Sequence, residues 1–340
     1  VGCTVITIIS GLIVLGGFSI ALMIPLLFIC RFLLGAFQGP LFPAMCGGVI
    51  TRWFPSGSWA LPNGMTSTAL ALGSASTPPI IVYLAEYFGW QSTFFLISIL
   101  GVIGSMIWWK YSTNWPNEHP DINQSELELI GETDFNNNEM TWPMIKEVLS
   151  NKNILFAALG YMSMNYVFFI FYSWIFIYFV NIRGFDVLEG SILASLPFLM
   201  GAIGATYGGY LCDRLQKRYG IIWGHRIPII IGLIPSAGFL LFGSITEHPY
   251  LAVLSLSLCY GFIELTEGPF WSTIGFISDK PQAAGGILNT GGNLGGVLAT
   301  PLIPIMVAQY DWVIALNSGG VFAILGVLFF MQVKFNEADE

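Results

Sequence analysis

ALGSASTPPIIVYLAEYFGW, residues 71–90, aligns without gaps to NLGGVLATPLIPIMVAQYDW, residues 293–312. A shorter pair, QGP at 38–40 and EGP at 267–269, precedes these segments in the same order. The aligned segments share leucine, glycine, proline, isoleucine and tryptophan, at Leu72/Leu294, Gly73/Gly295, Pro79/Pro301, Ile81/Ile303 and Trp90/Trp312. One match means little in apolar sequence, but the ordered series predicts two related halves.

The composition indicates that most of the chain lies in a membrane. Of its 340 residues, 55% are hydrophobic and only 9% are charged, whereas a soluble domain carries about 25% charged residues. A helix of about 20 apolar residues can cross a bilayer. Ten such runs are present, at approximately 3–21, 23–49, 60–86, 91–110, 153–180, 190–211, 227–244, 250–276, 283–308 and 313–333. We therefore expect an all-α membrane protein surrounded by the lipid bilayer.

Lysine and arginine predict the side of the membrane on which each loop lies. If the loops alternate between two sides, one side receives ten of these residues and the other receives only Arg183. Because basic loops are typical of the cytoplasm, we expect the central loop, 112–152, and the C-terminus to be cytoplasmic. This loop separates an N-terminal half of four spans, 1–111, from a C-terminal half of six, 153–340. We expect a short surface helix at 123–131.

The repeated segments also predict how the halves are related. They lie in spans two and three and again in spans eight and nine, six spans apart and in the same direction through the membrane. This is a parallel repeat with a period of six spans. Since the second half has six spans, we expect six in the first half too, with two helices before residue 1 missing from this chain.

Signatures of other functions are absent from the sequence. The five cysteines are scattered without a C-x-x-C pair, and His119, His225 and His248 fall in predicted loops, so we expect no metal site and no cofactor. No P-loop, HExxH or G-x-S-x-G motif occurs, which argues against an enzyme or an ATP-driven pump. The net charge of −8 does not indicate nucleic-acid binding. Together these features favour secondary transport.

The segment GYLCDRLQKR, residues 209–218, closes a span on the predicted cytoplasmic side. An acid followed by basic residues at a helix end can hold neighbouring helices through ion pairs and the dipole of a helix terminus. We therefore interpret Gly209, Asp213, Arg214 and Arg218 as a candidate motif for conformational gating. The alternative is a plain anchor that follows the positive-inside distribution.

These features resemble the major facilitator superfamily, whose twelve helices form two parallel six-helix halves. The G-x-x-x-D-R-x-x-(K/R)-R pattern at 209–218 is similar to the family's cytoplasmic loop motif. Other segments resemble its anion:cation symporter branch, the last two its bacterial members in particular: RFLLGAFQGPLFPA (31–44), RWFP (52–55), YFGWQSTFF (87–95), EHPDINQSELELI (118–130), LTEGPFW (265–271) and AAGGILNTGGNLGG (283–296). The resemblance implies a major facilitator fold, with about ten of twelve transmembrane helices in this chain.

The branch includes bacterial sugar-acid permeases and the organic-anion and glutamate carriers of animals. Its first, fourth, seventh and tenth helices line a central cavity, which implies that 23–49, 153–180 and 250–276 do so here. The resemblance thus implies a monomeric carrier in a bacterial inner membrane. It would import a small organic anion together with a proton or another cation, by alternating access.

Arg31 and Gln38 lie seven residues apart in one apolar run, so both occupy roughly one helix face. An arginine within a span is costly, and it persists where it faces a cavity, pairs with a carboxylate or recognises an anion. The family carries an arginine at this position, implicated in the substrate and proton path, and a guanidinium suits a carboxylate. Many relatives have a carboxylate where this chain has Gln38, which cannot titrate. We expect substrate contacts, against a structural ion pair for Arg31 and helix packing for Gln38.

Glu264 and Glu267 are the acids placed well within a predicted span, three residues apart on one helix face. Glu267 is also the repeat equivalent of Gln38. Our hypothesis is that the proton-coupling acid has moved to the second half, so that Arg31 and Glu267 face each other across the cavity. The simpler alternative makes Glu267 a fixed structural partner of Arg31 or of a neighbouring amide.

Two residues of the second half complete the expected substrate site. Asn289 falls where the family has a substrate-binding asparagine, and Trp271 aligns with a cavity aromatic of relatives. For Tyr166, Tyr172 and Trp174 we favour packing or lipid contact. The surrounding glycines resemble small-residue helix contacts that permit close approach, at Gly285, Gly286, Gly291, Gly292, Gly295 and Gly296.

The residues leave two other functions open. One is a drug or metabolite efflux carrier of the same fold, which would not respond to acidic sugars. The other is a non-transporting membrane sensor, which would bind its ligand without moving it.

Overall fold

A computed structural model describes residues 1–130 and 141–335, and the regular elements within these ranges are all helical. The long helices are α1 (Gly2–Leu15), α2 (Ile20–Gln38), α5 (Ala60–Phe88), α6 (Ser92–Tyr111), α9 (Lys152–Asn181), α11 (Ser195–Ile245), α12 (Pro249–Glu264), α13 (Glu267–Ile277), α14 (Pro281–Gln309) and α15 (Trp312–Phe330). The short helices are α3 (Leu41–Ala44), the π-helix η1 (Met45–Val49), α4 (Ile50–Trp53), the 3₁₀ turns η2 (Ser56–Ser58) and η3 (Pro116–Glu118), α7 (Gln124–Ile130), α8 (Trp142–Ser150) and α10 (Val187–Leu193).

Eight helical stretches of the described chain are long and apolar enough to cross a membrane. One of them, Val187–Ile245, holds two predicted spans, and the helix α1 is shorter and apolar. Dividing the long stretch at Gly220 and adding α1 gives the ten predicted spans. Many large side chains on the outside remain exposed, Phe28 and Trp109 among them, as expected where lipid tails are the solvent.

The loop predicted between spans 190–211 and 227–244 is wrong. Residues 212–219 and 221–226 are helical, and they are separated only by the non-helical Gly220, where φ is 77° and ψ is 170°. Positive φ is accessible to glycine without a side-chain clash, so this residue reverses the chain without an intervening loop. His225 is therefore helical and buried rather than in a loop.

Both repeated tripeptides lie at an interruption of a helix. α2 ends at Gln38 and α3 begins at Leu41, so QGP separates them, while α12 ends at Glu264 and α13 begins at Glu267, the first residue of EGP. Proline has no amide hydrogen and fits the first turn of a helix better than its interior, which favours a new helix start at both places. The predicted span 23–49 is accordingly broken, and it continues through the π-helix η1.

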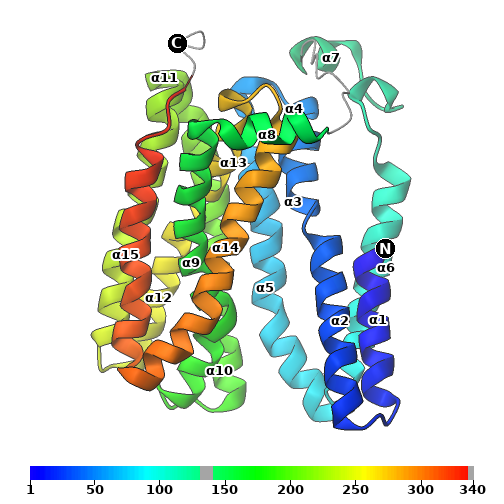
Figure 1. Cartoon of the computed structure of the whole chain (residues 1–340), viewed down its shortest axis with the longest axis vertical. Coiled ribbons are helices and arrows are strands. Elements are labelled where there is room, and N and C mark those ends of the chain that lie inside the picture. The colour runs from blue at the N-terminus through cyan, green and yellow to red at the C-terminus, as the bar shows by residue number, and fades with distance from the viewer. Residues whose placement is uncertain (131–140, 336–340) are drawn as a thin grey trace.

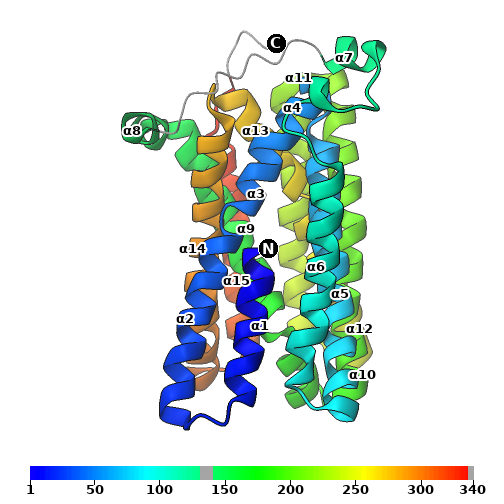
Figure 2. The ribbon, with the colours of Figure 1, turned by 90° about the vertical axis from the view of Figure 1, so that its right-hand side faces the viewer.

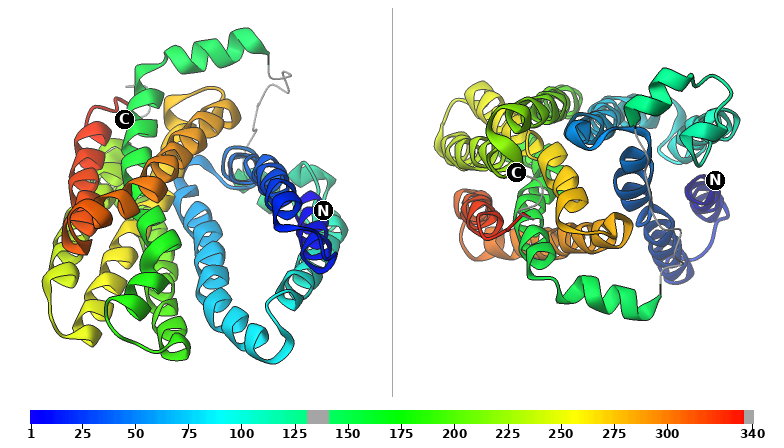
Figure 3. Two further views of the ribbon diagram at one scale, coloured as in Figure 1. Left: turned by 60° about the horizontal axis from the view of Figure 1, so that its bottom comes forward. Right: turned by 90° about the horizontal axis from the view of Figure 1, so that it is seen from above.

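The second half forms a close-packed bundle, and α5 of the first half lies along it (Figures 1 and 3). The largest fully buried side chains, from Ile154 to Phe330, all belong to α9–α15. Helices α1, α2 and α6 lie beyond α5, and α1 contacts both α2 and α6. Helix α5 is therefore the main structural connection between the first half and the bundle.

The helices α7 and α8 lie at one end of the molecule, called the α8 end below, and α10 lies at the opposite end (Figures 1 and 2). The surface helix predicted at 123–131 forms as α7, whereas α8 was not predicted. Part of the expected loop, 131–140, lies outside the described residues. The ion pair between Lys280 and Glu147, with an Nζ–Oε2 distance of 2.5 Å, fixes α8 to the start of α14.

Candidate functional site

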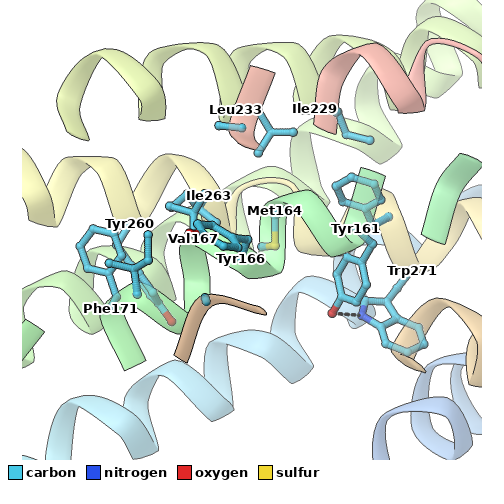
Figure 4. Close-up of a cluster of buried hydrophobic side chains, with 14 of the residues drawn as sticks. Tyr161, Met164, Tyr166, Val167, Phe171, Ile229, Leu233, Tyr260, Ile263 and Trp271 are labelled. Carbon is cyan, nitrogen blue, oxygen red and sulfur yellow. Dashed lines mark hydrogen bonds between the residues drawn. The ribbon is translucent and has the colours of Figure 1, made fainter. Parts of the chain in front are cut away.

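Glu267 lies at the break between α12 and α13 and is only 5% exposed. The hydroxyl group of Tyr161, on α9, lies 3.1 and 3.2 Å from the two carboxylate oxygens of Glu267. The Nε1–H of Trp271, one turn along α13, donates to the same hydroxyl oxygen over 3.1 Å. Figure 4 shows this second bond. Three side chains from two helices thus form one buried polar chain.

The direction of these hydrogen bonds follows from the chemistry of the groups. An indole N–H can only donate, so the Tyr161 oxygen accepts from Trp271. The single hydroxyl hydrogen is then free to donate to Glu267, and it is shared between the two carboxylate oxygens. No ion pair to Glu267 occurs among the residues that the structure describes. Within the described residues, its carboxyl group is therefore stabilised by hydrogen bonding and by its position in the first turn of α13 rather than by an ion pair.

The backbone of α14 fixes the position of Tyr161. A Cβ at Gly292 would lie 2.6 Å from Cε1 of Tyr161, and a Cβ at Gly291 would lie 2.8 Å from the carbonyl oxygen of Ala158. The ring also packs against Phe270, with centroids 5.4 Å apart. Sequence reasoning missed Tyr161, although the glycines that accommodate it were identified as helix contacts.

Glu264 is also buried, and its charge acts on that of Glu267. It is the last residue of α12, and the helix is interrupted before Glu267 begins α13. A Cβ at Gly201 would contact both Glu264 and Tyr260, which places these two side chains together. Its Oε1 has no hydrogen-bond partner among the described residues, so this carboxyl group is incompletely satisfied.

The structure does not bring Arg31 to Glu267. Arg31 and Gln38 are exposed on α2, and no ion pair or side-chain hydrogen bond of Arg31 occurs within residues 1–130 and 141–335. The alternative in which Glu267 is a fixed partner of Arg31 is therefore wrong for this conformation, because Glu267 instead accepts from Tyr161.

Asn289 connects the two halves directly. Its side-chain amide donates to the backbone carbonyl of Gly39 over 2.9 Å, immediately after Gln38. Asn293 donates to the carbonyl oxygen of Asn289 within its own helix. Asn289 and the end of α2 thus form a second group of predicted residues, separate from the buried chain around Glu267.

The aromatic residues of α9 separate into packing and exposed positions. Tyr166 stacks on Phe322 with centroids 3.9 Å apart, and its hydroxyl lies 2.9 Å from Ser318 Oγ. Tyr172 is exposed and lines a cavity of about 570 Å³ between α5, α9 and α11. None of the predicted substrate residues lines that cavity.

Asp213 joins the second half to the first amides of α5. Its two oxygens accept from the backbone N–H groups of Ala60 and Leu61, each over 3.0 Å. A carboxylate at a helix N-terminus satisfies free amides and interacts favourably with the helix dipole. Gly209 permits this approach, because a Cβ there would meet the carbonyl oxygen of Ala60.

The basic residues of the motif make no ion pair within the described chain. Arg214 donates to the Tyr210 hydroxyl over 3.1 Å, and the Arg218 guanidinium lies 5.2 Å from the ring centroid of Tyr219. The expected ion-pair contribution is therefore not seen, and the contact between the halves rests on Asp213. His225, which the sequence placed in a loop, lies 2.9 Å from Ser272 Oγ and joins α11 to α13.

The protein consists of membrane-spanning helices in two related halves. The halves meet where helices are broken and where a carboxyl group is buried. These features define a polytopic carrier. The sequence matches the Major Facilitator Superfamily over residues 1–285, and the chain belongs to this family. The family and the transporters to which the chain is similar confirm the expectation of a carrier rather than an enzyme.

Curated relatives and solved structures agree with this assignment. The chain is 31% identical to the "Probable galactarate/D-glucarate transporter GudP" of Bacillus subtilis, over 87% of this chain and 67% of that protein. It is 28% identical to the "Hexuronate transporter" of the same organism, over 93% and 75%. It is 26% identical to the "Probable sulfoacetate transporter SauU" of Cupriavidus necator, over 92% and 73%.

Among solved structures, the transporter FucP has a TM-score of 0.67 at 12% identity, covering 98% of this chain and 80% of that one. The proton:xylose symporter XylE has a TM-score of 0.66 at 17% identity, covering 98% and 79%. At these identities the likeness concerns the fold alone.

Proposed function

We propose that the protein carries a small organic anion, a sugar acid or a related carboxylate, across the membrane by alternating access. The observation that carries this proposal is the similarity over most of the chain to proteins named for galactarate, glucarate, hexuronate and sulfoacetate transport. These named compounds share an anionic group and polar substituents. Arg31, whose guanidinium has no partner within the described residues, supplies a group suited to a carboxylate.

The site residues take the following proposed roles. Arg31, Gln38, Trp271 and Asn289 bind the substrate, and Glu267, with Glu264 beside it, binds the coupling proton. Support for Glu267 comes from its burial and its single hydroxyl donor. Gln38 at the equivalent place of the first half cannot take a proton.

The remaining assignments concern topology. We assign 1–111 and 153–340 to the two halves and 112–152 to a central cytoplasmic loop, with a cytoplasmic C-terminus and a bacterial inner-membrane location. The supporting observation is the distribution of lysine and arginine. Gly209, Asp213, Arg214 and Arg218 form the proposed gating motif, supported by the bonds of Asp213 to α5. The carrier acts as a monomer.

Uptake by the protein reconstituted in liposomes tests this function. D-Glucarate, D-galacturonate and sulfoacetate are offered with and without an inward proton gradient, with D-glucose as the neutral control. We expect uptake of at least one acid, stimulated by the gradient in wild-type protein and not in Glu267→Gln. Glu86→Gln, an exposed acid of α5, is the matched control and keeps the stimulation.

The outcomes separate the parts of the proposal. Binding of an acid without counterflow would identify a sensor, and export of unrelated compounds would identify an efflux carrier. Gradient stimulation that persists in Glu267→Gln would reject this residue as the coupling acid while leaving organic-anion transport intact.

A further inference from the structure

We propose that Tyr161 is a positioning residue that connects the charge of Glu267 to the contact between Trp271 and Phe42 across the two halves. The inference deepens the proton-coupled transport proposed above and rests on it. Tyr161 is 5% exposed and Trp271 is 1% exposed, so their hydrogen bonds form away from water.

The first step is the response of the hydroxyl to the charge of Glu267. An ionised carboxylate accepts a charge-assisted hydrogen bond, which is roughly twice as strong as one between neutral groups. When Glu267 takes up a proton, the bond from Tyr161 becomes an ordinary one. The Tyr161 hydroxyl has no second acceptor among its hydrogen-bond partners in the described chain. The strength of this hydrogen bond therefore depends on the charge of Glu267, while its acceptor stays the same.

The second step passes from Tyr161 to Trp271. The indole N–H donates to the Tyr161 oxygen over 3.1 Å, and hydrogen bonds in such a chain polarise one another. The two rings also pack edge to face, with centroids 5.8 Å apart. Gly292 and Phe270 confine the Tyr161 ring. A change in its hydroxyl hydrogen bond therefore affects Glu267 and Trp271 rather than the position of the ring.

The third step reaches the first half. Trp271 packs against Phe42 with ring centroids 5.6 Å apart. Phe42 belongs to α3, which begins directly after the QGP break. Next to it, a Cβ at Gly285 would lie 3.3 Å from the Trp271 ring and 3.7 Å from Cα of Pro43. Trp271 is thus the side chain of the buried polar chain that contacts the other half.

Other titratable groups surround Glu267 and must be considered in any pH effect. Glu264 and Tyr260 face it from α12, Cys46 from the π-helix η1, and Tyr161 from α9. His225 of α11 faces Ser272 on α13. Of these groups, only Tyr161 bonds both Glu267 and Trp271, which is why its removal should have a distinctive effect.

The test compares Tyr161→Phe with wild-type protein in proteoliposomes. For each variant, gradient-driven uptake and substrate exchange without a gradient are measured from pH 5 to 8. We expect Tyr161→Phe to lower the ratio of driven uptake to exchange roughly tenfold and to alter its pH profile, since it removes a hydrogen bond to a charged group. Tyr166→Phe, which loses a hydroxyl on the same helix facing Ser318, is the matched control and keeps the wild-type pH profile.

The double variant Tyr161→Phe/Glu267→Gln shows whether Tyr161 acts through Glu267. If it does, the double variant has the pH profile of Glu267→Gln alone, because the two effects are not additive. Equal losses of driven uptake and exchange in Tyr161→Phe, or additive effects in the double variant, would overturn the positioning role. Failure of the proposed function is distinct, since wild-type protein would then show no gradient stimulation.

Discussion

Helices α5 and α14 present the same residues at equivalent repeat positions, yet within the described residues the glycine and the threonine contact another helix only on α5. Gly64, Thr68 and Leu72 of α5 correspond to Gly286, Thr290 and Leu294 of α14 in the register of the repeat. A Cβ at Gly64 would meet the carbonyl oxygen of Ala205, whereas nothing lies within 4 Å of one at Gly286.

The threonines show the same difference. Thr68 Oγ1 lies 2.7 Å from Thr206 Oγ1 and 3.0 Å from the carbonyl oxygen of Ala202, so it joins α5 to α11. Within the described residues, Thr290 bonds only to Gly286 of its own helix. Repeated sequence therefore specifies a surface suited to helix packing, but the neighbouring helix decides whether that surface stabilises the fold.

The largest expected difference concerns the two glycines. Gly64→Val forces a side chain into the backbone of α11, and we expect the free energy of unfolding to fall by about 3 kcal/mol. Gly286→Val adds its side chain to open space and should change stability by less than about 0.5 kcal/mol. Thermal unfolding of both purified variants in detergent measures this, and equal melting temperatures would contradict the comparison.

The helix starts differ as well, and the effect is of intermediate size. Asp213 of the second half caps the first amides of α5, whereas Lys280 at the start of α14 makes no side-chain cap. We expect Asp213→Ala to cost about 1 kcal/mol, as for other lost caps. Glu86→Gln, which changes an exposed acid of α5, serves as the control. A melting temperature for Asp213→Ala no lower than that of the control would reject the capping contribution.

The smallest expected effect is that of the threonine hydroxyl. Thr68→Val preserves the shape of the side chain and removes the hydroxyl that faces Thr206, which should cost about 0.6 kcal/mol. Thr290→Val should have no measurable effect, because its hydroxyl bonds only within α14. If both variants unfold like wild-type protein, the glycine contact alone distinguishes the two faces.

The sequence predicted the features that depend on periodicity, since the repeat and the apolar runs indicated the spans and the two halves. The breaks at QGP and EGP were missed, because the predicted spans 23–49 and 250–276 run through both tripeptides. The bend at Gly220 was missed because a single glycine with positive φ leaves no polar loop. Helix α8 was missed because its polar face made it look like part of the loop.

The candidate site was only partly predictable for a different reason. Glu267 and Trp271 lie four residues apart and could be recognised together, but Tyr161 precedes Glu267 by 106 residues. Only helix packing through Gly292 brings it near. Arg31 was expected opposite Glu267 because both lie within spans and Glu267 is the repeat equivalent of Gln38, which shares a helix face with Arg31. A place within a span gives the depth of a residue in the membrane, but it does not give the direction in which its side chain points around the helix.

The cap on α5 has a consequence for movement. The amides of Ala60 and Leu61 belong to the first half and the carboxylate of Asp213 to the second. If the halves separate at the α8 end, water can take over both amides and the carboxylate, so the number of hydrogen bonds need not fall. The two bonds therefore favour the one alignment of the halves in which both carboxylate oxygens accept from both amides. Because water replaces these bonds, they add little to the free energy needed to separate the halves. The contact of Asp213 with α5 would then be reversible, and it would return α5 to the same position after each transport cycle.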